Sequence, residues 1–187
     1  MRIQTKRGAI ELSINTIVII VLAMSMLILG LVLIKGLFSG ANDVIDLTND
    51  QVISKINAQF GSEDKVAIYP ITEEVEVKQG DKSGFAVVIR NKLTGSTSQD
   101  ALFSYSISVV SDTKKDCGIS KEKIMEFFVA GSESDSDIPI ATGEPLVKKV
   151  LLDTQEGDPL CTVQFRVDVK TNGKNYKSKY VFVTFTD

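Results

Sequence analysis

Three patterns of apolar and polar residues follow one another along the chain, and each predicts a different structure. The first is an apolar run from Leu12 to Ile34 that contains no charged residue. A helix over this run would be about 35 Å long at 1.5 Å per residue, longer than the roughly 30 Å hydrocarbon core of a membrane. A helix on the surface of a soluble domain would also show a polar stripe, which this run lacks. The pattern therefore predicts a transmembrane helix, which we place at residues 9–38.

Charges on the two sides of this run predict its orientation. Arg2, Lys6 and Arg7 precede it, whereas only Lys35 follows it directly. The positive-inside rule places the N-terminus in the cytoplasm and the C-terminal domain outside the cell, anchored to the cell membrane by a single pass. A cleavable secretory signal, cut near residues 39–41, is the alternative, although the apolar region of such a signal usually has only about 7–15 residues.

The second pattern has apolar residues mostly three or four positions apart, namely Val44, Leu47, Val52, Ile56 and Phe60. This spacing gives a helix one apolar face. We therefore predict an amphipathic helical stem over residues 39–61, continuous with the first helix. The alternative is a short separate helix that packs on the domain that follows.

The third pattern begins at Val66, where apolar residues alternate with polar ones as in strands with one buried face. The sets expected to share a face are Val75 and Val77; Phe85, Val87 and Ile89; Phe103, Tyr105, Ile107 and Val109; Val163, Phe165, Val167 and Val169; and Val181, Val183 and Phe185. Turn residues separate these segments, and Asn172-Gly173 is a strong signal for a two-residue hairpin. A short helix is expected at Ser120–Phe128, between strands.

About seven strands at this spacing predict an immunoglobulin-like antiparallel β-sandwich over residues 62–187. The predicted fold class is therefore α+β, with a long N-terminal transmembrane and amphipathic helix followed by this sandwich. Cys117 and Cys161 are too far apart for a CxxC redox or zinc motif. In an exported domain such a pair is best explained as one disulfide, and two buried free thiols are the alternative.

Composition excludes several classes of function. The net charge is −3, so a nucleic-acid partner is not expected. The chain has no histidine, which removes the commonest general base and the usual zinc ligands. Glu133, Asp135 and Asp137 alternate within residues 132–137 and could supply part of a calcium site, but a solvated loop is the expectation there. We predict no enzyme activity and no cofactor.

The N-terminal sequence "TKRG" followed by "AIELSINTIV" resembles the class III signal of archaeal type IV pilin-like proteins. The resemblance implies that residues 1–8 are a basic leader cut between Gly8 and Ala9, and that the apolar helix is retained for assembly. The new amine of Ala9 would then pair with Glu11 of a neighbouring helix. Glu11 would be the third residue after the cut, whereas the pilin pattern has a glutamate at the fifth. The alternative role for Glu11 is a first-turn acid favoured by the helix dipole.

These observations together predict a non-enzymatic, surface-exposed pilin-like subunit, with membrane lipids and further copies of the chain as partners. The layout is also similar to that of uncharacterised archaeal single-pass membrane proteins. The alternative function is a permanently membrane-tethered β-sandwich that binds a ligand or supports the envelope and does not polymerise.

Overall fold

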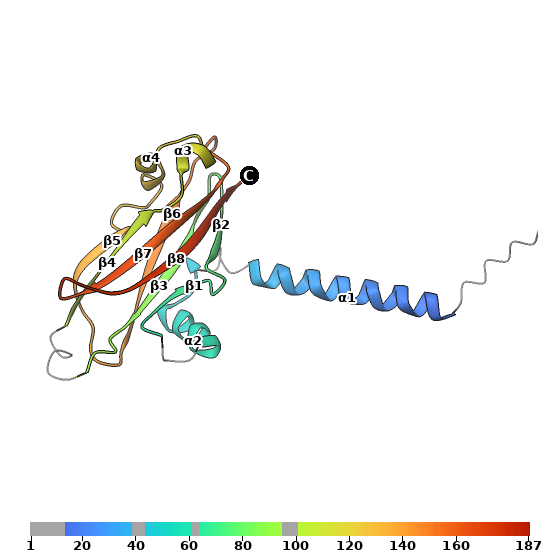
Figure 1. The fold of residues 1–187 in the computed structure, drawn as a ribbon, viewed down its shortest axis with the longest axis horizontal. Helices are drawn as coiled ribbons and strands as arrows, with labels where there is room; N and C mark the ends of the chain where they lie inside the picture. The colour runs from blue at the N-terminus through green and yellow to red at the C-terminus, as the bar shows by residue number, and fades with distance from the viewer. Residues whose placement is uncertain (1–13, 39–43, 61–63, 95–100) are drawn as a thin grey trace, which may run out of the picture. The chain divides into compact units, whose positions relative to one another are not determined.

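The computed structural model describes residues 14–38, 44–60, 64–94 and 101–187 (Figure 1). The chain divides into two compact units, Met1–Leu37 and Phe38–Asp187. Helix α1 (Ile14–Phe38) makes up the described part of the first unit. All strands belong to the second unit, which we call the head.

The predicted transmembrane span is wrong. Among the residues that the structure describes, no helix meets both the length and the apolar character needed to cross a membrane. The side chains of α1 are described over residues 16–32, a stretch of about 25 Å against a hydrocarbon core of roughly 30 Å. The predicted single-pass membrane location, with an extracellular head, rested on that span and is corrected with it.

The head is built from two β-sheets. The smaller sheet has the strand order β1-β3-β6, with β1 at Val66–Tyr69, β3 at Lys82–Arg90 and β6 at Pro145–Asp153. The larger sheet has the order β2-β8-β7-β4-β5, with β2 at Glu74–Lys78, β8 at Lys174–Thr186, β7 at Thr162–Thr171, β4 at Leu102–Val109 and β5 at Ser134–Pro139.

The sequence predicted a purely antiparallel sandwich, and this prediction is wrong. Strand β2 lies beside β8 and runs parallel to it, with Val75 opposite Val183. A tight turn follows β2, and in it the Asp81 amide donates to the Lys78 carbonyl at 3.1 Å. This turn carries the chain from the larger sheet into the smaller one, so β2 and β3 follow each other without pairing in one sheet.

The main core lies between the two sheets, and the alternation that predicted it is confirmed. Inward residues of the larger sheet are between 0 and 2% exposed, namely Val163, Phe165, Val167, Val169, Val181, Val183 and Phe185. They share a cluster with Phe85, Val87 and Ile89 of the smaller sheet. The predicted hairpin at Asn172-Gly173 is also confirmed, because both residues have positive φ and join β7 to β8.

Helix α2 (Asn49–Phe60) adds a third layer on the outer face of the smaller sheet. Thr48 begins it with a reciprocal cap, in which the Gln51 amide donates to Thr48 Oγ1 at 3.3 Å and the Thr48 amide donates to Gln51 Oε1 at 2.8 Å. Its apolar side packs against residues on the outer face of the sheet. Together they form a cluster whose members are Val44, Val52, Ile56, Ala67, Tyr69, Ala86, Val88 and Val147.

The α+β class with one long helix is therefore wrong, because the chain is mainly β and its two long helices are separate. Residues 45–47 form turns and a bend rather than α-helix. Buried Arg90 of β3 ties α2 to the head by donating to Asn57 Oδ1 and to the Asp64 carbonyl oxygen. The separate helix that packs on the domain, kept as the alternative, is the arrangement found.

An insert with two short helices, α3 (Thr113–Asp116) and α4 (Lys121–Met125), lies between β4 and β5. The helix predicted at Ser120–Phe128 is present as α4 and ends earlier. Phe127 and Phe128 leave the helix and enter the core, where their rings meet those of Phe185 and Phe165 edge-on. The same segment pairs with β6, since the Val129 amide donates to the Leu151 carbonyl at 2.9 Å. The insert therefore covers an edge of the smaller sheet.

Gly84 of β3 lies against the backbone of β6, and its replacement gives a first prediction. A Cβ atom at this buried position would overlap the carbonyl oxygen of Val150, which is backbone and cannot turn away. We expect Gly84→Ala to lower the free energy of unfolding by about 3 kcal/mol or more, measured by urea denaturation. Gly30→Ala is the control, because a Cβ there meets nothing within 4 Å. Equal stability of the two variants would contradict this account.

Candidate assembly surface

The described surface of α1 is apolar on all sides. Every large apolar side chain from Ile17 to Val32 is exposed, between 46 and 75%. The hydroxyl of Ser25 donates to the Val21 carbonyl at 2.8 Å, so it is satisfied within the helix. Helices that are apolar all round are normally buried, and apolar patches of this extent usually mark interaction surfaces.

Three residues predicted to serve assembly lie outside the described residues. These are Gly8 and Ala9, at the expected leader cut, and Glu11, the expected assembly carboxylate. Cleavage after residue 8 and pairing of the Ala9 amine with Glu11 therefore stay predictions.

The disulfide expected between Cys117 and Cys161 is present, with 5.3 Å between the two Cα atoms. Cys117 ends α3, where its amide donates to the Thr113 carbonyl at 2.8 Å. Cys161 directly precedes β7, and its carbonyl accepts from the Phe185 amide at 2.8 Å. The bond therefore fixes the insert to the end of the larger sheet, which is a bracing role.

The outer face of the larger sheet has a hollow of about 420 Å³ at the end where β2 pairs with β8. We call it the β2–β8 hollow, and it is lined by Glu74, Val75, Glu76, Thr162, Phe182, Thr184 and Thr186. Phe182 is 41% exposed although it sits in a strand whose neighbouring residues are buried. Thr186 Oγ1 donates to Glu76 Oε1 at 3.0 Å. The hollow thus combines an aromatic ring, hydroxyl groups and carboxylates.

A second hollow of about 470 Å³ lies over β4, β5 and β7 and is more polar. Its carboxylates already have partners. Asp135 pairs with Lys148 at 2.7 Å, and this contact lowers the pKa of Asp135. Asp168 accepts from Arg166 Nε at 2.8 Å and from Ser178 Oγ at 2.6 Å. The charges of these two carboxylates are therefore neutralised, while Lys170, which also lines this hollow, forms no ion pair with the described residues.

The acidic segment 132–137 is not the solvated loop that the sequence predicted. Most of it belongs to edge strand β5, because buried Ile138 draws the segment against β4. Asp135 turns to Lys148, while Asp137 accepts from Ser136 Oγ at 3.0 Å. In the described parts of the chain, no cluster of three acidic, histidine or cysteine residues could hold a metal ion.

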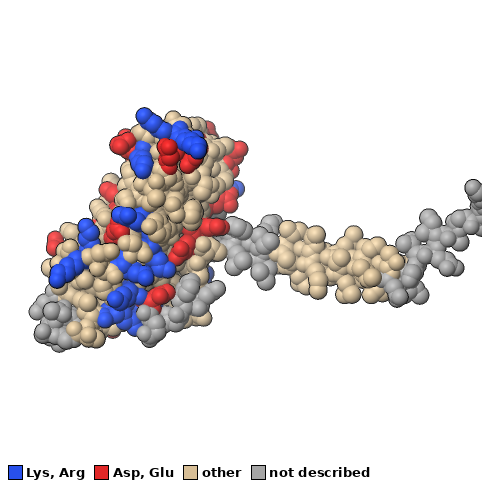
Figure 2. Space-filling model, viewed as in Figure 1, with Lys and Arg blue, Asp and Glu red and all other residues tan. Residues whose placement is uncertain are grey.

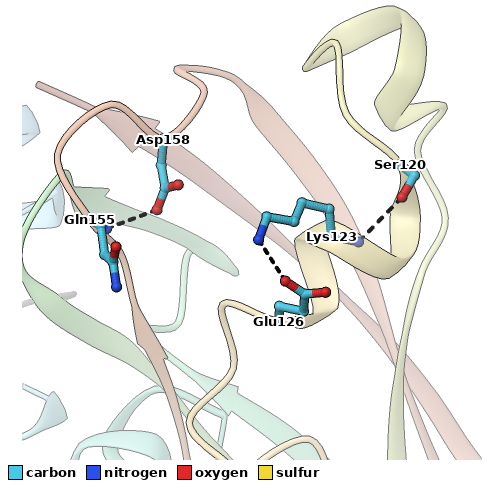
Figure 3. Close-up of polar contacts among 5 residues, drawn as sticks. All are labelled: Ser120, Lys123, Glu126, Gln155 and Asp158. Carbon is cyan, nitrogen blue, oxygen red and sulfur yellow. Dashed lines mark hydrogen bonds and ion pairs between the residues drawn. The ribbon is translucent and has the colours of Figure 1, made fainter.

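A third, smaller hollow of about 210 Å³ lies between α4 and the loop before β7. Figure 3 shows Lys123 reaching Glu126, with 2.6 Å between Lys123 Nζ and Glu126 Oε2. The hydrogen bond and charge of Glu126 raise the pKa of Lys123, and Asp158 acts in the same direction. On the opposite wall, the Gln155 amide donates to Asp158 Oδ2 at 2.8 Å. These exposed pairs suit a solvated surface.

Sequence reasoning missed the β2–β8 hollow, although one signal was available. Phe182 stands between Val181 and Val183, so it breaks the alternation and must face outward. No such signal in the sequence indicated that β2 pairs in parallel with β8 and places Glu74 beside Phe182.

No protein-family model matches the chain, and no curated protein matches it in sequence. Among solved structures, it is similar to the periplasmic chaperone SfaE, with 12% identity and a TM-score of 0.38 over 65% of this chain and 56% of that one. It is also similar to a PapD-like domain of human CEP192, with 9% identity and a TM-score of 0.39 over 67% of this chain and 87% of that one. The chain thus spans about half the length of SfaE.

Removal of the disulfide should destabilise the head. The bond closes a loop across a sequence separation of 44 residues, and restricting the unfolded chain in this way is worth about 3–4 kcal/mol. We expect the double variant Cys117→Ala, Cys161→Ala to lose roughly that free energy of unfolding in urea. Reductant should shift the wild type equally and leave the variant unchanged. A wild type insensitive to reductant would contradict the bracing role.

Tyr105 should make the head less stable at high pH. It is 4% exposed and donates its hydroxyl to the Ser132 carbonyl at 3.1 Å. Burial, together with the charges of Asp135 and Glu133, raises the pKa of Tyr105 to about 12. An unfolded tyrosine ionises near pH 10. The unfolded chain therefore loses a proton that the folded chain keeps, and stability falls as pH rises between about 10 and 12.

The measurement is urea unfolding at several pH values from 9 upward. We expect Tyr105→Phe to remove about 2–3 kcal/mol of the wild-type decline over that range. Tyr180→Phe, at an exposed position of β8, is the matched control and should keep the wild-type slope. Identical slopes for Tyr105→Phe and wild type would refute the assignment.

Proposed function

We propose that the protein is a non-enzymatic structural subunit that assembles with further copies of itself through α1. The single observation that carries this proposal is the apolar, exposed surface of α1 over residues 17–32. The resemblance of the N-terminal segment to archaeal type IV pilin-like proteins agrees with it and adds leader removal at Gly8 as part of the same proposal.

The surface of α1 calls for several neighbours rather than one. A single helical partner covers only one stripe of a helix. In a coiled coil, for example, two residues of every seven face the partner. Exposed residues of α1 include consecutive positions such as Ile17 to Leu22, which point in every direction around the axis. Packing among several copies of α1 would surround the helix, and such an arrangement is a bundle or a filament core.

The energy of this burial is sufficient for assembly. A fully buried Leu, Ile, Val or Met side chain contributes about 1.5–3 kcal/mol. Burial of several of them would offset the cost of lost freedom on association, about 4–15 kcal/mol. The head has its own core between its two sheets, so α1 is free to serve association instead of folding.

A charge in α1 should therefore prevent assembly. Leu27 is 64% exposed and lies outside the two core clusters of the head, so Leu27→Lys should leave the fold of the head intact. In an assembly, the ammonium group would be buried without a partner, which costs several kcal/mol. We expect the concentration needed for assembly to rise at least about a hundredfold, measured by sedimentation velocity and negative-stain electron microscopy.

The matched control is Leu160→Lys, the same change at a 51% exposed leucine of the head. This variant should assemble like the wild type. Thermal unfolding of the head should be the same in all three proteins. A wild type that stays monomeric at every concentration, or a Leu27→Lys variant that assembles normally, would overturn the proposal.

A further inference from the structure

The hairpin of β7 and β8 has a basic end at its turn. Lys170 and Lys174 flank the turn and Lys177 follows it, and all three are exposed. None of the carboxylates in the described ranges forms an ion pair with them. Figure 2 shows Lys and Arg side chains gathered over the lower left of the head, where Figure 1 draws this turn. These ammonium groups are available to a partner.

The other end of the same hairpin has the opposite character. Among the residues that the structure describes, the charged ones that line the β2–β8 hollow are Glu74 and Glu76, so its charge is negative. Glu74 lies directly beside exposed Phe182 in the strand register. Phe182 follows Lys174 by eight positions in β8, a separation of about 27 Å along the strand. The basic turn and the acidic hollow are therefore distinct surfaces of one sheet.

The chemistry of the hollow fits a lysine side chain. A carboxylate attracts the ammonium group, threonine hydroxyls can accept its hydrogen bonds, and the face of a phenylalanine ring attracts a cation. An anionic ligand would be repelled by both glutamates. Because the chain itself carries lysines that form no ion pair with the described residues, the occupant that fits the charge of the hollow is a second copy.

We propose that the β2–β8 hollow receives the lysines of the β7–β8 turn, Lys170 and Lys174, from a neighbouring copy. The inference rests on assembly through α1. An exposed ion pair is weak by itself, but copies joined through α1 hold their heads at a high effective concentration, at which weak contacts form. The contact joins two different surfaces, so it is heterologous and can continue from copy to copy in a ring or a filament.

Cross-linking in the assembled full-length protein tests this contact. The chain has two cysteines and both are in the disulfide, so an added cysteine reacts selectively with a short bismaleimide. A variant with both Glu74→Cys and Lys174→Cys should give a ladder of dimers, trimers and larger products. A mixture of the two single variants should stop at the dimer, and each single variant should give almost none. The matched control carries Glu156→Cys with Lys174→Cys, so that the first cysteine replaces a different exposed glutamate. This variant should not give a ladder.

Charge exchange supplies an independent measurement. Either Glu74→Lys or Lys174→Glu should raise the concentration needed for assembly by about three- to tenfold. The double exchange should restore most of that loss. High salt should weaken the contact in the wild type while α1 association persists.

The outcomes separate the two proposals. A wild type that does not sediment as an assembly overturns both. Normal sedimentation without a cross-linked ladder and without an effect of charge exchange overturns the head contact alone. Loss of assembly in Glu74→Lys that Lys174→Glu does not rescue also contradicts it, because the hollow would then bind something other than this turn.

Discussion

Strand β3 is buried on both of its faces, and this double burial holds the head together. Phe85, Val87 and Ile89 fill the core between the sheets, while Ala86 and Val88 receive α2 on the opposite side. The small side chain of Ala86 and the absence of one at Gly84 allow close approach at this strand. Because α2 satisfies the outer face of β3, it belongs to the head and cannot extend α1 as a stem. Helix α1 belongs to the other compact unit, and its large apolar side chains over residues 17–32 are exposed.

The alternation of the strands was sufficient to predict which residues form the core, because the side-chain period of two decides the face. It does not decide which strand lies next to which. The parallel pairing of β2 with β8 depends on a turn at Lys78–Asp81 that changes sheets, and a tight turn between alternating segments is usually a sign of pairing. The hollow beside Phe182 could not be predicted for the same reason, since three of its seven lining residues come from β2.

The position of α2 was predictable in part. Its spacing gave the correct apolar face, but the same face would serve a helix in a stem or a helix on a sheet. The missing information was in β3, where Phe85 to Ile89 form an unbroken apolar run instead of alternating. Such a run indicates a strand covered on both faces, and α2 is the cover. The apolar run of α1 is ambiguous in the same way. It shows that the helix needs apolar surroundings, but it does not show what provides them.

The two proposed associations depend on different forces, so each would make a different contribution to assembly. Packing of α1 is apolar, which makes it strong, insensitive to salt and tolerant of rotation or sliding between similar side chains. The contact of the β7–β8 turn with the β2–β8 hollow is polar and weak, but charge pairs fix which surfaces may meet. Apolar burial would then supply the affinity, and the charged head contact would select the register. Over residues 17–32 the described surface of α1 is apolar apart from small or polar positions such as Ser25, so a charged contact between heads would add a feature that distinguishes one register from the next.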